Sequence, residues 1–96
     1  MQVIKIGKRK FEIGQLVATP GALLLAQGID LDLFSLLARH LVGDWGDICT
    51  SDKAENELSL ENDFRLLSAY NTPAGTMWII TEADRSVTNF LLPEEY

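Results

Sequence analysis

The chain contains one cysteine and one histidine among 96 residues, and this scarcity limits its chemistry. Cys49 cannot form an internal disulfide, and with His40 as the sole imidazole the chain lacks the ligands of a structural zinc site. No run approaches the roughly 18 apolar residues of a membrane span, and the start MQVIKIGKRK lacks the apolar core of a signal peptide. A chain this small also has little room for a deep cofactor pocket. We therefore expect a cytoplasmic domain without metal or cofactor.

Basic residues are also few, and they are unevenly distributed. Eight lysines and arginines against fourteen acidic residues give a net charge of −6 and a pI near 4.5. Residues 11–96 contain only four of those cations and all fourteen acids, a net charge of −10. Such a body repels phosphates, so a protein partner with a basic surface is a better expectation than a nucleic acid. The alternative is that the acidic charge serves solubility alone. Nucleic-acid binding is expected only through the remaining cations, Lys5, Lys8, Arg9 and Lys10.

Helix-capping residues and apolar spacing predict two helices before residue 43. Thr19-Pro20 is a typical helix start, because threonine can cap a helix and proline fits its first turn, and a short helix is expected over 22–27. A second helix follows, capped by Asp30 or Asp32. Three leucines spaced four residues apart give it an apolar face typical of a helix packed on a core: Leu33, Leu37 and Leu41.

A third helix is predicted over 51–60. Thr50 or Ser51 can cap it, and Ala54 and Leu58 are expected to face inward. After residue 63 the apolar period changes from 3.6 to 2, which indicates strands. We expect an antiparallel meander whose strands are 64–70, 76–81 and 86–92. Four side chains are expected to share one face of it: Trp78, Ile80, Phe90 and Leu92.

These elements define an α+β fold as a single domain over 1–96. Two or three short helices pack on an antiparallel sheet that ends in the three-stranded meander. The alternation over 2–6 and the apolar residues over 11–17 predict an additional N-terminal hairpin. The hairpin and a final edge strand, FLLPEEY, would leave open edges, so a homodimer is also expected.

The single histidine is predicted to lie in the last turn of a helix, before a carboxylate-rich loop. The negative helix end and Asp44 or Asp47 would favour the charged form of His40, which makes it a candidate general acid or base. In a simpler interpretation Arg39 and His40 complement the helix end while Trp45 fills the core. As a binding surface, the loop would offer Asp44, Trp45 and Asp47.

A second polar cluster occupies the turn between the last two predicted strands. Arg85 could hold a phosphate or carboxylate there, with Ser86 and Thr88 supplying hydroxyls. In the simpler interpretation this is a polar β-turn in which Asp84 and Ser86 bond the backbone and Arg85 pairs with Glu82. Glu82 and Asp84 are also candidate binding residues.

The third cluster is acidic and covers the predicted third helix and its exit. Only Lys53 offsets its carboxylates, which belong to Asp52, Glu55, Glu57, Glu61 and Asp63. Such a surface is usually a solvated helix face, but it can also bind a cationic partner or imitate the charge of a nucleic-acid backbone. We count Asp52, Glu55, Glu57 and Glu61 among the candidate binding residues.

Three segments together resemble one protein family. VATPGA at 17–22, LARH and GDWGD within 37–47, and WIITEADRS at 78–86 with LLPEEY at 91–96 are similar to small bacterial plasmid-related or integrative-element proteins, often labelled restriction-system subunits. The resemblance spans residues 16–96 and implies a mobile-element setting without an established activity.

A fainter resemblance, in element order, is to the ribonuclease superfamily that includes barnase, the colicin ribonucleases and RelE-type toxins. It implies that His40 serves as acid or base, Arg85 stabilises the phosphorane, and Ser86 or Thr88 positions the phosphate. Such a site must gather cations against a polyanion, whereas the body of this chain is acidic. We therefore expect a mobile-element accessory protein that binds a basic protein partner, with a metal-independent ribonuclease of the toxin type as the alternative.

Overall fold

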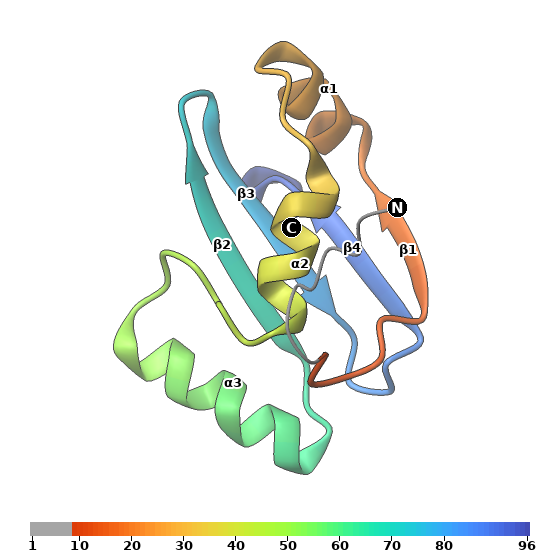
Figure 1. Cartoon of the computed structure of the whole chain (residues 1–96), viewed down its shortest axis with the longest axis vertical. Coiled ribbons are helices and arrows are strands. Elements are labelled where there is room, and N and C mark those ends of the chain that lie inside the picture. Colours follow the sequence, from red (N-terminus) through yellow and green to blue (C-terminus); the bar gives the residue numbers. More distant parts are fainter. Residues whose placement is uncertain (1–8) are drawn as a thin grey trace, which may run out of the picture.

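The structure is a computed structural model that describes residues 9–96, so the predicted strand over 2–6 lies outside the described residues. It confirms an α+β fold in which the helices precede a meander of strands (Figure 1). In chain order the elements are β1 (Gln15–Ala18), α1 (Pro20–Gly28), α2 (Leu33–Leu41), α3 (Thr50–Asn62), β2 (Leu66–Thr72), β3 (Gly75–Thr81), β4 (Val87–Leu91) and a 3₁₀ turn, η1 (Pro93–Glu95).

The four strands form one mixed sheet in the order β1-β4-β3-β2. The pairings of β2 with β3 and of β3 with β4 are antiparallel, which confirms the predicted meander. β1 lies parallel to β4, with Gln15 opposite Val87, so the expectation of a wholly antiparallel sheet is wrong. β4 consequently lies between β1 and β3 and is not the edge strand predicted from FLLPEEY. The homodimer stays a prediction.

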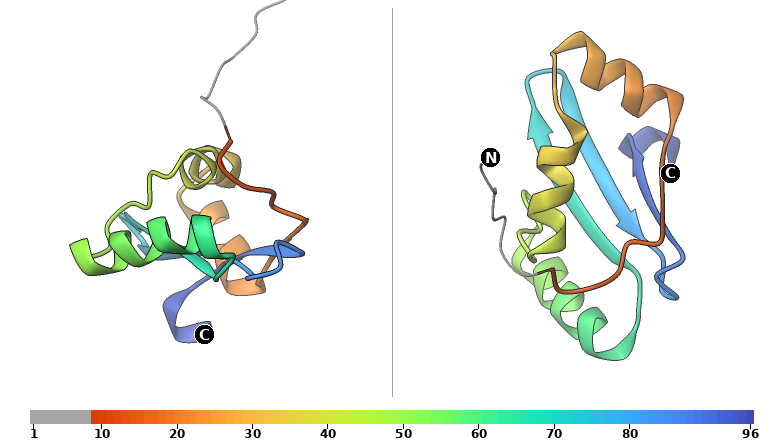
Figure 2. Two further views of the ribbon diagram at one scale, coloured as in Figure 1. Left: turned by 90° about the horizontal axis from the view of Figure 1, so that it is seen from below. Right: turned by 45° about the vertical axis from the view of Figure 1, so that its right-hand side comes forward.

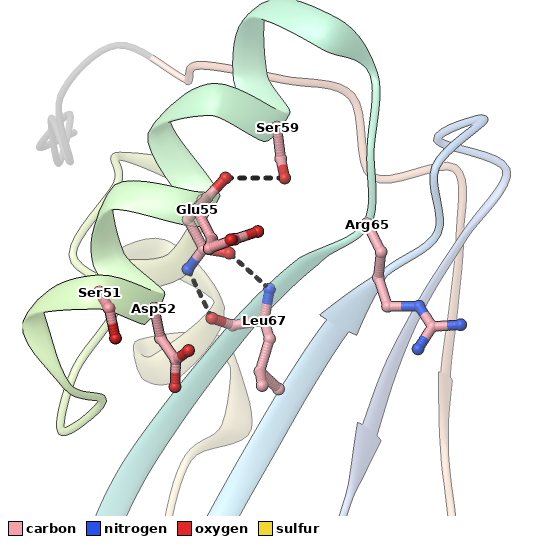
Figure 3. Close-up of a pocket in the computed structure, with 7 residues that line it drawn as sticks. Ser51, Asp52, Glu55, Ser59, Arg65 and Leu67 are labelled. Carbon is pink, nitrogen blue, oxygen red and sulfur yellow. Dashed lines mark hydrogen bonds between the residues drawn. The ribbon is translucent and has the colours of Figure 1, made fainter.

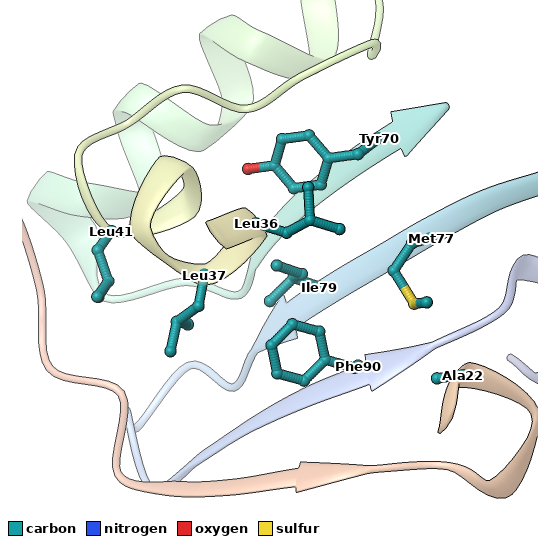
Figure 4. Close-up of a cluster of buried hydrophobic side chains, with 8 residues drawn as sticks. All are labelled: Ala22, Leu36, Leu37, Leu41, Tyr70, Met77, Ile79 and Phe90. Carbon is teal, nitrogen blue, oxygen red and sulfur yellow. The ribbon is translucent and has the colours of Figure 1, made fainter. Parts of the chain in front are cut away.

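The core lies between α2 and one face of the sheet, as Figure 4 shows. Its buried side chains come from α1, α2 and the strands β2, β3 and β4: Ala22, Leu36, Leu37, Leu41, Tyr70, Met77, Ile79 and Phe90. Ile79 stands opposite Phe90 in the register, and Trp78 stands opposite Leu91. Trp78 and Ile80 therefore point to the opposite face of the sheet from Phe90. The prediction that these side chains share one face is wrong, because the residues of β3 that share the face of Phe90 are shifted by one position.

Leu37 tests the assigned face of α2. It is 6% exposed, so we expect Leu37→Ala to lower the free energy of unfolding by about 2–4 kcal/mol through lost burial and a residual cavity. Phe34 lies on the same helix but is 67% exposed, and Phe34→Ala is expected to change stability by less than about 0.5 kcal/mol. Urea unfolding monitored by circular dichroism measures both, and equal losses would contradict the assignment.

The starts of α1 and α2 follow the predicted capping chemistry. The Thr19 hydroxyl accepts from the backbone N–H of Ala22 at 3.1 Å, and the Asp32 carboxylate accepts from that of Phe34 at 3.0 Å. Within residues 9–96 no single helix is long and apolar enough to cross a membrane, and only the pair α1 and α2, bent by 112°, meets that criterion of length and composition.

The third helix packs differently from its prediction. Its N-cap residue is Cys49, whose side chain makes no capping hydrogen bond, so the expected cap at Thr50 or Ser51 is wrong. Ala54 is exposed and Leu58 is 56% exposed, whereas the buried residues of α3 are polar: Asn56 and Ser59. α3 lies beside β2 and away from the main core (Figure 2), so it has little apolar surface to contact.

Asn56 explains how a polar helix side packs against the sheet. Its amide donates to the Leu67 carbonyl at 2.7 Å and accepts from the Leu67 N–H at 3.1 Å. These are the two hydrogen bonds that another strand would supply to the outer edge of β2. Burying Asn56 therefore leaves no polar group of this contact unpaired, which makes an apolar helix face unnecessary here.

Candidate functional site

The His40 imidazole is fully buried near the end of α2. It belongs to a chain of hydrogen bonds that links α2 to hydroxyl groups on the strands of the sheet. Its Nδ1 lies 2.5 Å from the Ser68 Oγ, and its Nε2 lies 2.9 Å from the Thr81 Oγ1. The Thr81 and Thr88 hydroxyl oxygens are 2.8 Å apart, and the Thr88 hydroxyl donates to the Ile13 carbonyl at 2.9 Å.

The end of this chain fixes where its protons lie. Because the Thr88 hydroxyl donates to a carbonyl, the Thr81 hydroxyl donates to Thr88, and the Nε2–H of His40 donates to Thr81. The Ser68 hydroxyl then donates to Nδ1 of His40. Each link has one donor and one acceptor only when the imidazole is neutral. A second proton on His40 would break this arrangement.

Burial also keeps His40 neutral. The rings of Phe11 and Trp45 have their centroids 5.1 and 5.6 Å from the imidazole. Burial, assisted by the positive charge of Arg85, lowers the pKa of His40 from 6.5 to about 3. The predicted stabilisation of the charged form is therefore wrong, because desolvation outweighs the influence of the helix end, which is worth about 0.3–1 kcal/mol.

The loop after α2 uses its carboxylates to hold itself in place. Asp44 accepts from the Nε of Arg39 at 2.7 Å and from its Nη2 at 3.3 Å. The hydrogen bond from this guanidinium holds the pKa of Asp44 below its usual value. Asp47 accepts from the N–H of Asn71 at 2.9 Å. The predicted binding residues of this loop therefore form contacts within the fold.

Trp45 confirms the simpler interpretation of this loop, in which it fills the core. The side chain is buried, and its indole N–H donates to the Glu57 carboxylate at 2.8 Å. This bond ties the loop to α3. Trp45 therefore has no exposed ring with which to contact a partner, and Glu57 already has a structural role.

Arg85 stabilises the C-terminal end of α3. Its guanidinium donates to the carbonyls of Phe64 at 2.6 Å and Ser59 at 2.9 Å, and also to those of Glu82 and Ala83. A cation is favourable beside the carbonyls of a helix C-terminus, and the Ser59 carbonyl also accepts from the backbone N–H groups of Asp63 and Phe64. The expected pairing of Arg85 with the Glu82 carboxylate is wrong, because that carboxylate lies 3.7 Å from the Nε of Arg65.

The remaining turn residues separate in space. Ser86 is exposed, and both its N–H and its hydroxyl donate to the Asp84 carboxylate, at 3.0 and 2.5 Å. Thr88 is fully buried. The structure thus brings His40 and Thr88 together through Thr81, whereas Ser86 lies on the surface.

Sequence reasoning missed Ser68 and Thr81, the other members of the buried chain. Ser68 lies opposite Ile79, and Thr81 is two residues after Ile79 on the same strand. Because side chains two residues apart point to the same face, the register would have placed both hydroxyls on the core face with Ile79.

Three acidic residues of α3 are accessible to a partner. Asp52, Glu55 and Glu61 are all exposed. Asp52 and Glu55 line one side of a polar groove of about 280 Å³ between α3 and β2, with Arg65 on the other side (Figure 3). Over residues 9–96 no three histidine, cysteine or acidic side chains are placed to hold a metal ion.

Comparisons with protein-family models, curated proteins and solved structures find no match to this chain. The two resemblances noted in the sequence therefore stay predictions.

Proposed function

We propose that the protein binds a partner protein with a basic surface through the exposed carboxylates of α3, as an accessory protein of a bacterial mobile element. The observation that carries this proposal is the set of exposed carboxylates on one helix, Asp52, Glu55 and Glu61, against the single cation Lys53. The other acidic candidates, Asp44, Asp47, Glu57, Glu82 and Asp84, have contacts within the fold.

The attachment of α3 suits it to present this charge. Asn56 holds its inner side to the backbone of β2, and Arg85 holds its last turn. A helix fixed at two places loses little conformational freedom when a partner binds. The net charge of −10 over residues 11–96 adds long-range attraction for a cationic surface and repels phosphates.

The positions of the catalytic candidates favour binding over the ribonuclease alternative. A general acid or base must reach the proton that it transfers, and it works best when its pKa is near the operating pH. His40 is buried with a pKa of about 3, and the guanidinium of Arg85 is engaged by backbone carbonyls. Neither group is arranged to meet an RNA phosphate.

Removing charge from α3 is expected to slow association. We expect Glu55→Gln with Glu61→Gln to lower the association rate constant for the captured partner about three- to tenfold at about 50 mM salt, with little effect at about 500 mM salt. The partner is captured from a bacterial lysate at low salt and identified, and the rates are measured by surface plasmon resonance.

A matched control removes the same charge elsewhere. Glu12 and Glu94 are exposed and lie outside α3, so Glu12→Gln with Glu94→Gln should slow association by less than about twofold. Equal slowing by both pairs would mean that net charge alone acts, and would contradict a site on α3. RNA cleavage by the purified protein that His40→Ala abolishes would replace the binding function with the ribonuclease.

A further inference from the structure

The two edges of the sheet are treated differently by the fold. At the β2 edge, Asn56 satisfies the backbone of Leu67. Further along, the Ala69 N–H donates to the Trp45 carbonyl at 3.1 Å, and the Asp47 N–H donates to the Ala69 carbonyl at 2.6 Å. This edge is therefore closed to further strand pairing.

The β1 edge has no such cover within residues 9–96. The Gln15 N–H donates to the Ser86 carbonyl at 2.8 Å, and the Thr19 N–H donates to the Phe90 carbonyl at 3.0 Å. Because these residues face β4, the alternate residues Leu16 and Ala18 direct their N–H and C=O groups outward. The strand QLVA also lacks the charges and prolines that commonly protect an edge.

An apolar groove of about 240 Å³ runs beside this open edge. Seven residues line it: Leu16, Val17, Ala18, Leu23, Leu33, Phe34 and Phe90. Phe34 forms its exposed wall. The right-hand view of Figure 2 brings this side of the molecule forward, with β1 leading up to the start of α1. An extended peptide paired with β1 would place alternate side chains toward this groove.

The charge next to the groove indicates what kind of segment fits. Asp30 and Asp32 line an adjoining hollow of about 320 Å³, which shares Leu23, Leu33 and Phe34 with the groove. Among residues 9–96, no cationic residue lines either space. A lysine or arginine near one end of an added strand would complement these carboxylates, whereas a second copy of this chain would bring a net charge of −6.

We infer that β1 binds an extended segment of a partner protein, which pairs with the open backbone of Leu16 and Ala18, places apolar side chains in the groove and sets a basic residue against Asp30 and Asp32. The basic residue of the segment is inferred from Asp30 and Asp32, so this site goes beyond the proposed function of α3 and does not depend on it. The site lies at the opposite edge of the sheet from α3, so each surface can be tested alone.

The probe is a synthetic nine-residue peptide in which valine alternates with threonine and two lysines follow at one end. Hydrogen exchange of the full chain, followed by NMR, should show at least tenfold slower exchange of the Leu16 and Ala18 amides with saturating peptide. The Val17 amide, which faces β4, should change little. A peptide with two glutamates in place of the lysines should bind at least tenfold more weakly at low salt.

Matched variants locate the peptide. Phe34→Ser should weaken binding at least fivefold, whereas Leu24→Ser, at a side chain 68% exposed and outside the groove, should change it less than twofold. Asp30→Asn with Asp32→Asn, in which asparagine can still cap α2, should weaken it about three- to tenfold at low salt. Glu55→Gln with Glu61→Gln should leave peptide binding unchanged.

Three results would overturn the inference. Slow exchange of Leu16 and Ala18 in the free protein at every concentration would mean that the chain itself occupies the edge. Protection that rises with protein concentration, together with a dimer in light scattering, would assign the edge to a second copy. Peptide binding that Phe34→Ser leaves unchanged would place the peptide elsewhere.

Discussion

Lowering the pH from 6.5 to 3 is expected to remove roughly 4 kcal/mol from the free energy of unfolding through His40 alone. In the unfolded chain the imidazole takes up a proton near pH 6.5, whereas in the folded protein its pKa is about 3. Between these values the unfolded state binds more protons, so stability falls as the pH falls. The depressed pKa of Asp44 acts in the same direction at acidic pH.

Urea unfolding at several pH values between 7 and 4 measures this slope. His40→Gln serves as the control, because its amide can donate to Thr81 but does not titrate in this range. We expect the variant to be about 1–3 kcal/mol less stable at pH 7, since part of the buried chain loses its partner. Its stability should then change less with pH than that of the parent. An equal slope in both proteins would contradict a buried neutral histidine.

Gly46→Ala is expected to destabilise the fold by about 3 kcal/mol or more. Gly46 has a φ of +79°, a conformation that residues with side chains rarely adopt. A Cβ there would also press against the backbone carbonyl of Ala69, well inside van der Waals contact. The loop would have to move away from β2. This movement would break the hydrogen bonds that Trp45 and Asp47, on either side of Gly46, make with Ala69.

Gly28→Ala is the matched control for this substitution. Gly28 is the last residue of α1, and a Cβ there would meet nothing within 4 Å. We expect a change between zero and a gain of about 1 kcal/mol, because alanine favours a helix and restricts the unfolded chain. Urea unfolding compares the two, with hydrogen exchange of the Ala69 amide as a local measurement. A Gly46→Ala protein as stable as its parent would contradict the close approach of the loop to β2.

Local signals predicted most of the fold, but they did not give the phase of the strands. Thr19 and Asp32 cap the helices that the sequence predicts, because capping depends on residues only two or three positions apart. In β3 and β4, both faces carry apolar side chains, so alternation cannot say whether Trp78 or Ile79 faces the helices. The parallel pairing of β1 depends on contacts distant in sequence, for which no local signal exists.

The candidate site was harder to predict, because burial decides its chemistry. The sequence places His40 correctly in the last turn of a helix, but it does not show the rings of Phe11 and Trp45 around the imidazole. Asn56 and Ser59 look like surface residues in the sequence. Their burial follows from a hydrogen-bonding edge of β2 that only the assembled sheet provides.

The parallel pairing of β1 with β4 also sets an order of assembly. Gln15 lies opposite Val87, so β1 must wait for a strand that is synthesised 72 residues later. At about 5–20 residues per second, roughly 4–14 s pass before that partner exists. The hairpin of β2 and β3 joins neighbours in the sequence and closes a much shorter loop. The N-terminal strand is thus made first but completes the sheet last, and its apolar residues stay without a strand partner for most of the synthesis of the domain.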